Sequence, residues 1–153
     1  MKNIAIFPGS FDPITKGHEA LVKRALPLFD KIIIAIGENN SKAAYFSLEN
    51  RLQWIKKVFE QEPKIEVVSF SGLTIELCKQ KSAGFILRGL RTSADFEFER
   101  GIGQMNKFMY SSIDTVFLLT EAKFTPITSS IVRDIHRNGG DVSQFVPDAI
   151  KIS

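Results

Sequence analysis

Five short runs of apolar residues recur along the chain, separated by longer segments in which apolar and polar positions alternate less regularly. The run at 31–36 (KIIIAI) is typical, since it is rich in isoleucine and is stopped by Gly37. β-branched residues in a short, continuous apolar run favour a buried strand. The predicted strands are residues 2–7, 31–36, 65–68, 85–87 and 115–119.

The segments between these runs show the period of a helix. Leu48, Leu52, Ile55 and Phe59 recur every three or four residues after Ser47, whose hydroxyl suits the N-terminal cap of a helix. The same pattern, with glycine or proline at the ends, predicts further helices. The predicted helices are residues 17–28, 48–59, 73–81, 92–110 and 129–138, with a final short helix from about residue 143.

Strands and helices alternate, and the strands are uniformly apolar. This combination predicts an α/β fold in which a doubly wound sheet of about five parallel strands carries helices on both faces. The length suits a single domain over residues 1–153. Open sheets of this class bind ligands at the carboxyl ends of the strands, beside the point where the strand order reverses. Candidate chemistry is therefore expected in the loops after the strands.

Composition narrows the class of protein. Hydrophobic residues make up 44% of the chain and charged residues 24%, with a net charge of +3, and no run of apolar residues reaches membrane-spanning length. The weak positive charge fits anionic small molecules and does not by itself indicate nucleic acid. Cys78 is the only cysteine, so an internal disulfide is excluded, and its apolar surroundings predict a buried structural thiol in a cytoplasmic protein.

The loop after the first strand has the composition of a phosphate site. It reads PGSFDPITKGH over residues 8–18. Gly17 and His18 open the next helix, where unpaired N–H groups attract anions. The loop matches neither a Walker motif nor a Gly-x-Gly-x-x-Gly fingerprint. His18 taken alone could equally be a capping or surface histidine, whereas His136 has no such context and is predicted to be a surface residue.

Two further segments carry candidate chemistry. Arg88 and Arg91 flank Gly89 directly after the fourth strand, and arginine suits phosphate oxygens because its planar fork presents paired donors. The alternative is a pair of exposed arginines bound to acidic residues such as Asp95 or Glu99. Residues 124–133 (FTPITSSIVR) open the last long helix with hydroxyl groups, which suit either a helix cap or a phosphate.

If the first and fourth strands are neighbours at the switch point, His18 and both arginines should converge. The three segments together resemble the nucleotidylyltransferase superfamily with its Thr/His-x-Gly-His motif. Within it, the chain is similar to the bacterial phosphopantetheine adenylyltransferases over nearly its whole length. The resemblance is carried by residues 8–18 (PGSFDPITKGH), 41–42 (SK), 86–91 (ILRGLR), 94–99 (ADFEFE), 105–106 (MN) and 127–133 (ITSSIVR).

The resemblance implies a fold, a reaction and a set of residues. The fold is a five-stranded Rossmann-like domain, usually assembled as a hexamer, and the reaction transfers the adenylyl group of ATP to 4′-phosphopantetheine, giving dephospho-coenzyme A and pyrophosphate. His18 is implied to stabilise the transition state, with Lys42 and Arg91 also catalytic. Residues implied to bind the acceptor are Ser10, Lys42, Thr74 and Arg88. Residues implied to bind ATP are Ser10, Phe11, His18, Gly89, Leu90, Arg91, Glu99, Phe124, Thr125, Pro126, Ile127, Thr128, Ser129 and Ser130.

The implied chemistry needs no general base, because the attacking phosphate of the acceptor is already ionised at neutral pH. Catalysis then consists of positioning and of neutralising charge at the phosphates. We expect positive donors from His18, Lys42, Arg88 and Arg91. We also expect Mg²⁺ to arrive with ATP, because the sequence shows no cluster spaced for a dedicated metal cage.

Three alternatives stay open from the sequence. A sister transferase could move CMP or AMP to another phosphate acceptor, and a non-catalytic nucleotide sensor could use the same scaffold. An RNA-binding module is the third, although the chain shows neither a basic stripe nor a stacking platform. No nucleic acid and no membrane are expected as partners.

Overall fold

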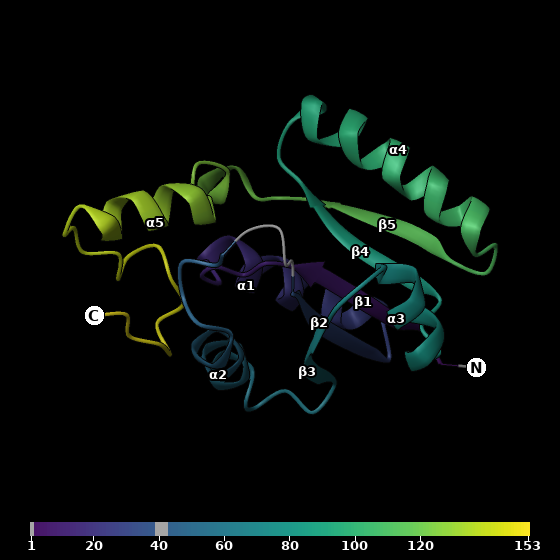
Figure 1. Ribbon diagram of the computed structural model, residues 1–153, viewed down its shortest axis with the longest axis horizontal. Coiled ribbons are helices and arrows are strands. Elements are labelled where there is room, and N and C mark those ends of the chain that lie inside the picture. The colour runs from purple at the N-terminus through teal and green to yellow at the C-terminus, as the bar shows by residue number, and fades with distance from the viewer. Residues whose placement is uncertain (1, 39–42) are drawn as a thin grey trace.

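The computed structural model describes residues 2–38 and 43–153, and its centre is one sheet of five parallel strands (Figure 1). The strand order is β3-β2-β1-β4-β5. This confirms the predicted parallel sheet. The observed strands run up to three residues beyond the predicted carboxyl ends, because parallel pairing continues into the next residues, as at Pro8 and Gly9 opposite Ala35 and Ile36. The strands are β1 (Ile4–Gly9), β2 (Lys31–Gly37), β3 (Ile65–Phe70), β4 (Phe85–Leu90) and β5 (Asp114–Leu119).

Five α-helices lie where the sequence predicted them. The first ends earlier than expected, at Ala25, and continues as a 3₁₀ turn that contains Pro27. Proline has no N–H to continue the α-helical ladder, which accounts for the early end. The helices are α1 (Lys16–Ala25), α2 (Leu48–Val58), α3 (Thr74–Lys81), α4 (Ser93–Met109) and α5 (Ser129–Arg137), with the 3₁₀ turns η1 (Leu26–Leu28) and η2 (Ala122–Phe124).

The predicted short helix from residue 143 was wrong. Val142, Val146 and Ile150 recur every four residues and are buried, as a helix would require. The backbone instead makes two separate turns, in which Phe145 donates to the carbonyl of Val142 and Ile150 donates to that of Pro147. The apolar spacing therefore reflects three anchors on the core rather than a helical face.

Both faces of the sheet are covered, as predicted, and the alternation of side chains along each strand assigns them. Ile32 and Ile34 of β2 point to a core shared with α1, α2 and α5, whereas Ile33 points to a second core with Leu77 and Cys78 of α3. Cys78 is fully buried, and burial raises the pKa of its thiol to about 11. The predicted structural thiol is thereby confirmed.

The switch point lies between β1 and β4. From β1 the chain moves outward through β2 to β3 and then returns to place β4 on the other side of β1. The carboxyl ends of β1 and β4 are therefore adjacent, although about eighty residues separate them in sequence. No helix within residues 2–38 and 43–153 is long and apolar enough to cross a membrane.

Candidate active site

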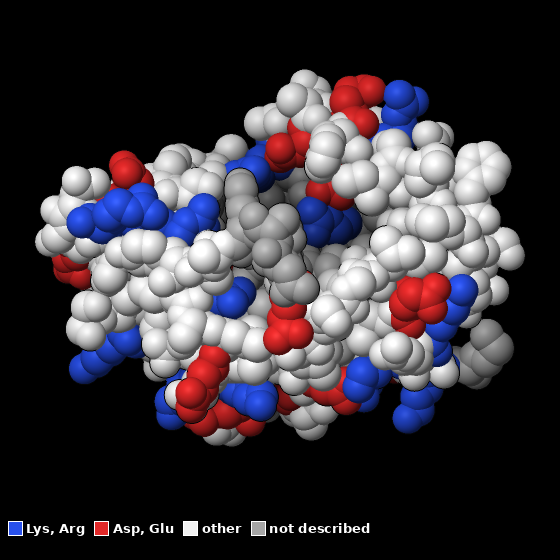
Figure 2. Space-filling model, in the orientation of Figure 1, with Lys and Arg blue, Asp and Glu red and all other residues white. Residues whose placement is uncertain are grey.

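Two cavities open beside the carboxyl ends of β1 and β4, and they share Ser10 and Arg88. The acceptor cavity, as we name the larger one, measures about 660 Å³ and lies toward α3 and α4. The nucleotide cavity measures about 360 Å³ and lies toward the N-termini of α1 and α5. Figure 2 shows the hollow on this face, with both basic and acidic atoms inside it. The predicted convergence of His18 with both arginines is confirmed, because all three line the nucleotide cavity.

The nucleotide cavity is bordered by the N-termini of two helices. Thr15 caps α1 and accepts a hydrogen bond from the N–H of His18, and Thr128 caps α5 and accepts one from the N–H of Ile131. Both capping residues line the cavity. Each helix end therefore presents a partial positive charge to the same space, which suits the phosphates of a nucleotide.

His18 is held in one tautomer by this cap. The N–H of Thr15 donates to Nδ1 of His18 over 3.0 Å, so Nδ1 is an acceptor and the proton of the neutral ring sits on Nε2. Phe11 packs edge-on against the ring, with centroids 4.9 Å apart. The capping role and the functional role therefore coexist, since the cap leaves Nε2–H as the free donor.

The surroundings of His18 lower its pKa. Burial of the ring, with further contributions from the positive charges of Arg91 and Arg88, lowers its pKa from 6.5 to about 4. With no phosphate bound, the lowered pKa favours a neutral ring at pH 7, and the positive charge expected on His18 during the reaction stays a prediction. A neutral Nε2–H still donates a hydrogen bond to a phosphate oxygen.

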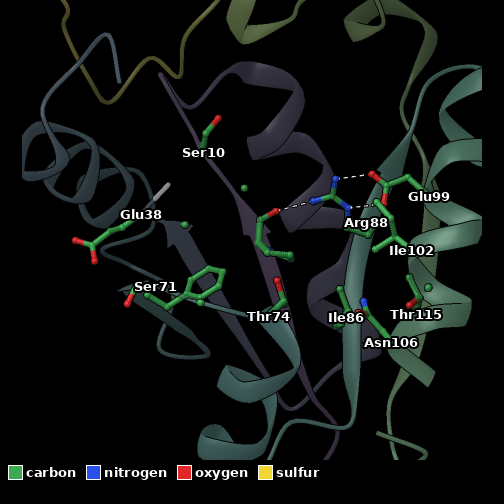
Figure 3. A pocket seen from close by; sticks show the side chains of 16 residues that line it. Ser10, Glu38, Ser71, Thr74, Ile86, Arg88, Glu99, Ile102, Asn106 and Thr115 are labelled. Atoms are coloured by element: carbon green, nitrogen blue, oxygen red, sulfur yellow. Dashed lines mark hydrogen bonds and ion pairs between the residues drawn. The ribbon is translucent and has the colours of Figure 1, made fainter. Parts of the chain in front are cut away.

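Arg88 is fixed by three hydrogen bonds at the boundary between the cavities (Figure 3). Its Nε and Nη2 both donate to the carboxylate of Glu99, the first over 3.0 Å, and Nη1 donates to the carbonyl of Pro8 over 2.8 Å. The ion pair with Glu99, which the sequence offered as an alternative to phosphate binding, is therefore present. Arg88 lines both cavities all the same. Ion pairing and ligand binding do not exclude each other here.

Arg91 is held less firmly. Its Nε lies 3.4 Å from Asp95, and its side chain is 41% exposed. Asp95 also accepts from the N–H groups of Arg91 and Thr92 and so closes the cap of α4. Arg91 lines the nucleotide cavity only, which leaves its guanidinium able to follow the phosphates of a ligand.

The acceptor cavity has both apolar and polar walls. Phe70, Ile86 and Ile102 supply apolar surface, while Asn106 and Thr115 supply polar groups at one end (Figure 3). A Cβ added at Gly103 would lie 3.1 Å from Oγ1 of Thr115, so glycine allows α4 to approach β5 closely there. The cavity suits an extended ligand with a phosphate at Arg88 and a less polar arm.

Most of the residues named from the resemblance line one of the two cavities, and their roles stay predictions. Ser10 lines both cavities, Thr74 lines the acceptor cavity, and Gly89 lines the nucleotide cavity. The implied ATP residues Phe11, His18, Arg91, Phe124, Ile127, Thr128, Ser129 and Ser130 also line the nucleotide cavity. Lys42 lies outside the described residues.

Four of the implied ATP residues do not line the nucleotide cavity. Leu90 turns into the core, and Pro126 is exposed. Thr125 donates from its hydroxyl to the carbonyl of Glu121 within the turn before α5. Glu99 lines the acceptor cavity instead, because its position on α4 faces β4. His136 is half-buried, lines neither cavity and contacts the hydroxyl of Tyr45 over 2.7 Å.

Two further residues of this region, Asp12 and Arg133, were given no role of their own from the sequence. Asp12 is buried, and its carboxylate accepts from the N–H groups of Tyr45 and Phe46, which ties the loop after β2 to the loop after β1. Arg133 lines the nucleotide cavity, and its Nη1 donates to the carbonyl of Asp12 over 2.8 Å. The spacing of Arg133 one turn after Ser130 was the available signal.

Comparison with known proteins identifies the family. The model of the cytidylyltransferase-like family matches residues 6–135. A protein of Flavobacterium psychrophilum named phosphopantetheine adenylyltransferase is 57% identical over 97% of both chains, and one of Cytophaga hutchinsonii with the same name is 51% identical over 96% of this chain and 98% of its own. The chain belongs to the phosphopantetheine adenylyltransferase family. It is thus a nucleotidyltransferase by family.

Solved structures support the fold independently. A putative nicotinate-nucleotide adenylyltransferase of Vibrio parahaemolyticus superposes with a TM-score of 0.71 over 97% of this chain and 96% of that one, at 17% sequence identity. A bifunctional NMN adenylyltransferase/ADP ribose pyrophosphatase of Francisella tularensis gives 0.73 over 98% of this chain and 46% of that one, at 19% identity. At such identities the likeness concerns the Rossmann-like fold alone.

Proposed function

We propose that this chain transfers the adenylyl group of ATP to 4′-phosphopantetheine, giving dephospho-coenzyme A and pyrophosphate. The observation that carries the proposal is the pair of cavities that meet at Arg88 and Ser10, one bordered by helix N-termini and the other lined by both apolar and polar side chains. A nucleotide triphosphate suits the first cavity, and a phosphate with a pantetheine arm suits the second. The name of the relatives at 51–57% identity supports the same pair of substrates.

The reaction then runs across the boundary between the cavities. A phosphate oxygen of the acceptor attacks the α-phosphorus of ATP, the bond from that phosphorus to the bridging oxygen breaks, and pyrophosphate leaves. Arg88 orients the acceptor phosphate, while His18 donates from Nε2 to the α-phosphate as negative charge builds there. Arg91 and the N-terminus of α5 face the leaving pyrophosphate. We assign Lys42 to the same reaction by resemblance.

Mg²⁺ is proposed to enter with the nucleotide. The described part of the chain contains no group of three or more His, Cys, Asp or Glu side chains that could hold a metal ion, and no acidic residue lines the described nucleotide cavity. His18, Arg91 and the N-terminus of α5 would bind the phosphates, and the ion would be held through those phosphates. When bound, the ion would offset charge on the leaving pyrophosphate.

We also propose a homohexamer, and α4 offers the surface for assembly. Several large apolar side chains on this helix are exposed, among them Phe98 at 70% and Phe108 at 86%. With Ile102, Met105 and Met109 they form an apolar surface that a monomer would leave in water. Light scattering measures the assembly, and charged substitutions at Phe98 and Phe108 should reduce the mass. A cytoplasmic location is consistent with the single buried thiol.

The decisive experiment follows pyrophosphate release from purified protein with Mg²⁺-ATP and 4′-phosphopantetheine. Parallel reactions replace ATP by CTP, and the acceptor by nicotinamide mononucleotide. Pyrophosphate formed only with ATP and phosphopantetheine supports the proposal. Turnover with another pair would retain a nucleotidyltransferase and replace the acceptor. ATP binding without turnover in any reaction would favour a nucleotide sensor.

A further inference from the structure

Phe11 has a backbone conformation that bulky residues rarely adopt. Its φ is +45°, in the left-handed region, where a large side chain crowds the backbone. The ring is buried and packs edge-on against Phe7 and His18, with centroids 5.3 and 4.9 Å away. Because such a conformation persists only where neighbouring groups hold it, the groups that hold Phe11 bear on the nucleotide cavity that it lines.

Arginine side chains hold the backbone on either side of Phe11. Nη1 of Arg51 donates to the carbonyl of Ser10 over 2.8 Å, from α2. Nη1 of Arg133 donates to the carbonyl of Asp12 over 2.8 Å, from α5. The turn is therefore fixed at both ends by guanidinium groups from two different helices.

Arg51 differs from the other arginines around this turn, because it lines neither the acceptor cavity nor the nucleotide cavity. It is only 6% exposed and borders a third cavity of about 690 Å³. Its Nε donates to the carbonyl of Phe46 over 3.1 Å, just before α2 begins, which fixes the plane of the guanidinium. Arg51 therefore does not reach a ligand in the first two cavities, but it holds backbone that lines them.

The anchor at Ser10 sets the direction of one N–H group. The Ser10–Phe11 peptide is trans, so its C=O and N–H point in opposite directions. Since the carbonyl points to Arg51, the N–H of Phe11 points away from that side chain. Within residues 2–38 and 43–153 this N–H binds no acceptor, and both Ser10 and Phe11 line the nucleotide cavity. A free backbone N–H in such a turn suits a phosphate oxygen.

The left-handed φ of Phe11 and the direction of this N–H have the same origin. Rotating the Ser10–Phe11 peptide by half a turn would move φ of Phe11 from +45° to about −135°, in the broad region that large residues prefer. The same rotation would reverse the N–H of Phe11 and break the hydrogen bond from Arg51 to Ser10. Arg51 therefore stabilises the peptide orientation that the backbone alone disfavours.

We propose that Arg51 is a positioning residue for the nucleotide: from α2 it fixes the Ser10–Phe11 peptide, so that the N–H of Phe11 faces a phosphate of ATP. The inference rests on the proposed function, which supplies the nucleotide, and extends it to a residue that touches neither substrate. The carboxylate of Asp12 keeps its two bonds to the N–H groups of Tyr45 and Phe46 without Arg51. Loss of Arg51 should therefore release this one peptide rather than the whole loop.

The substitution Arg51→Gln removes the contact with Ser10 selectively. The amide nitrogen of glutamine lies as many bonds from the backbone as Nε of arginine, so it can still donate to Phe46 but does not reach Ser10. We expect the Kd of Mg²⁺-ATP, measured by calorimetry, to rise about tenfold, as for one lost hydrogen bond to a charged group. In nuclear magnetic resonance spectra, the amide proton of Phe11 should shift when ATP is added to wild type and should shift much less in Arg51→Gln.

The substitution Ile55→Val is the matched control for stability. Ile55 lies one turn after Arg51 on the same helix and is fully buried, so its truncation lowers the free energy of unfolding without removing a hydrogen bond of the turn. Its Kd of ATP and its Phe11 amide shift should match those of wild type. An equal rise of the Kd in both variants would indicate a merely structural role for Arg51 and overturn the inference. So would an Arg51→Gln protein whose Phe11 amide still responds fully to ATP.

Failure of the inference and failure of the proposed function give different results. If wild-type protein does not bind ATP, both fail. If wild type binds ATP with a shift of the Phe11 amide but forms no pyrophosphate, the proposed reaction fails and the inference stands. If wild type is active and Arg51→Gln binds ATP as wild type does, only the inference fails. Should Arg51→Gln not fold, Arg51→Met carries the same test, because its unbranched apolar side chain suits the buried position and donates to neither carbonyl.

Discussion

The two cavities differ in the groups that line them. The nucleotide cavity is made largely of helix N-termini, backbone N–H groups and short polar side chains within two segments, 8–18 and 124–133. The acceptor cavity combines apolar and polar side chains from β3, β4, β5, α3 and α4, which come together only when the sheet is assembled. The phosphate-binding features of the nucleotide cavity are therefore local and repeat at two helix ends, whereas the walls of the acceptor cavity depend on packing between distant segments.

The comparison predicts that substitutions in the nucleotide cavity change kcat or the KM of ATP, and that those in the acceptor cavity change the KM of the acceptor. Arg88 and Ser10 belong to both and are expected to change both. The following experiments test this division, beginning with the largest effect.

The substitution His18→Ala should give the largest effect. Removing the Nε2–H donor should lower kcat by about 10²–10³-fold, the loss typical of a donor that stabilises a transition state. The Kd of ATP should change by less than about threefold, because the hydrogen bond strengthens only as charge builds. Steady-state assays of pyrophosphate release measure kcat, and calorimetry measures the Kd of ATP. His136→Ala is the control, as His136 lines neither cavity; a parallel loss of ATP binding and kcat would contradict the assignment.

The substitution Gly103→Leu tests the acceptor cavity from its far end. A Cβ at position 103 would lie 3.1 Å from Oγ1 of Thr115, at the end of the acceptor cavity. A leucine side chain at this position should occupy that end of the cavity and displace the pantetheine arm. We expect the KM of phosphopantetheine to rise about tenfold, the cost of one displaced apolar group, and the KM of ATP to stay unchanged. Gly101→Leu on the same helix is the matched control, because a Cβ there has no neighbour within 4 Å. An equal rise in both KM values would remove the distinction between the cavities.

Removal of the α5 cap should have a smaller effect. Thr128→Ala deletes the acceptor for the N–H of Ile131 and should lower the free energy of unfolding by about 1 kcal/mol. Ser47→Ala, which removes the equivalent cap of α2, should cost a similar amount. Only Thr128→Ala should also raise the KM of ATP, by about threefold, because only Thr128 borders the nucleotide cavity. Urea unfolding and steady-state kinetics separate the effects; a raised ATP KM in both variants would argue against the site.

The pH dependence of stability should show the smallest effect. The pKa of His18 is lowered from 6.5 to about 4 by burial and by Arg91 and Arg88, so the unfolded chain binds a proton at a higher pH than the folded one. The free energy of unfolding should therefore fall as the pH drops from about 6.5 to about 4. His18→Gln should lose this part of the dependence, visible as a change of a few degrees in Tm across the window. His136→Gln should retain it; identical profiles for wild type and His18→Gln would contradict the lowered pKa.

The helices, the strands and the phosphate-binding segments were predictable from the sequence because each depends on residues close together in the chain. The isoleucine-rich runs form strands, and Thr15 and Thr128 cap helices. The segment 8–18 contains both the cap and the first turn of α1, so its phosphate-binding groups are close together in the sequence. The exception at Val142, Val146 and Ile150 has the same origin, since a local period of four also arises from separate anchors on a core.

The sequence by itself determined the parallel sheet, the phosphate-binding segments and the resemblance to a family. Only the tertiary structure decided that Glu99 turns to Arg88, that Asp12 ties two loops together, and that the pKa of His18 is lowered. These depend on contacts between segments about ten to eighty residues apart and on the loss of solvent around them. Burial and neighbouring charge set a pKa or an ion pair, and neither can be evaluated before the chain has folded.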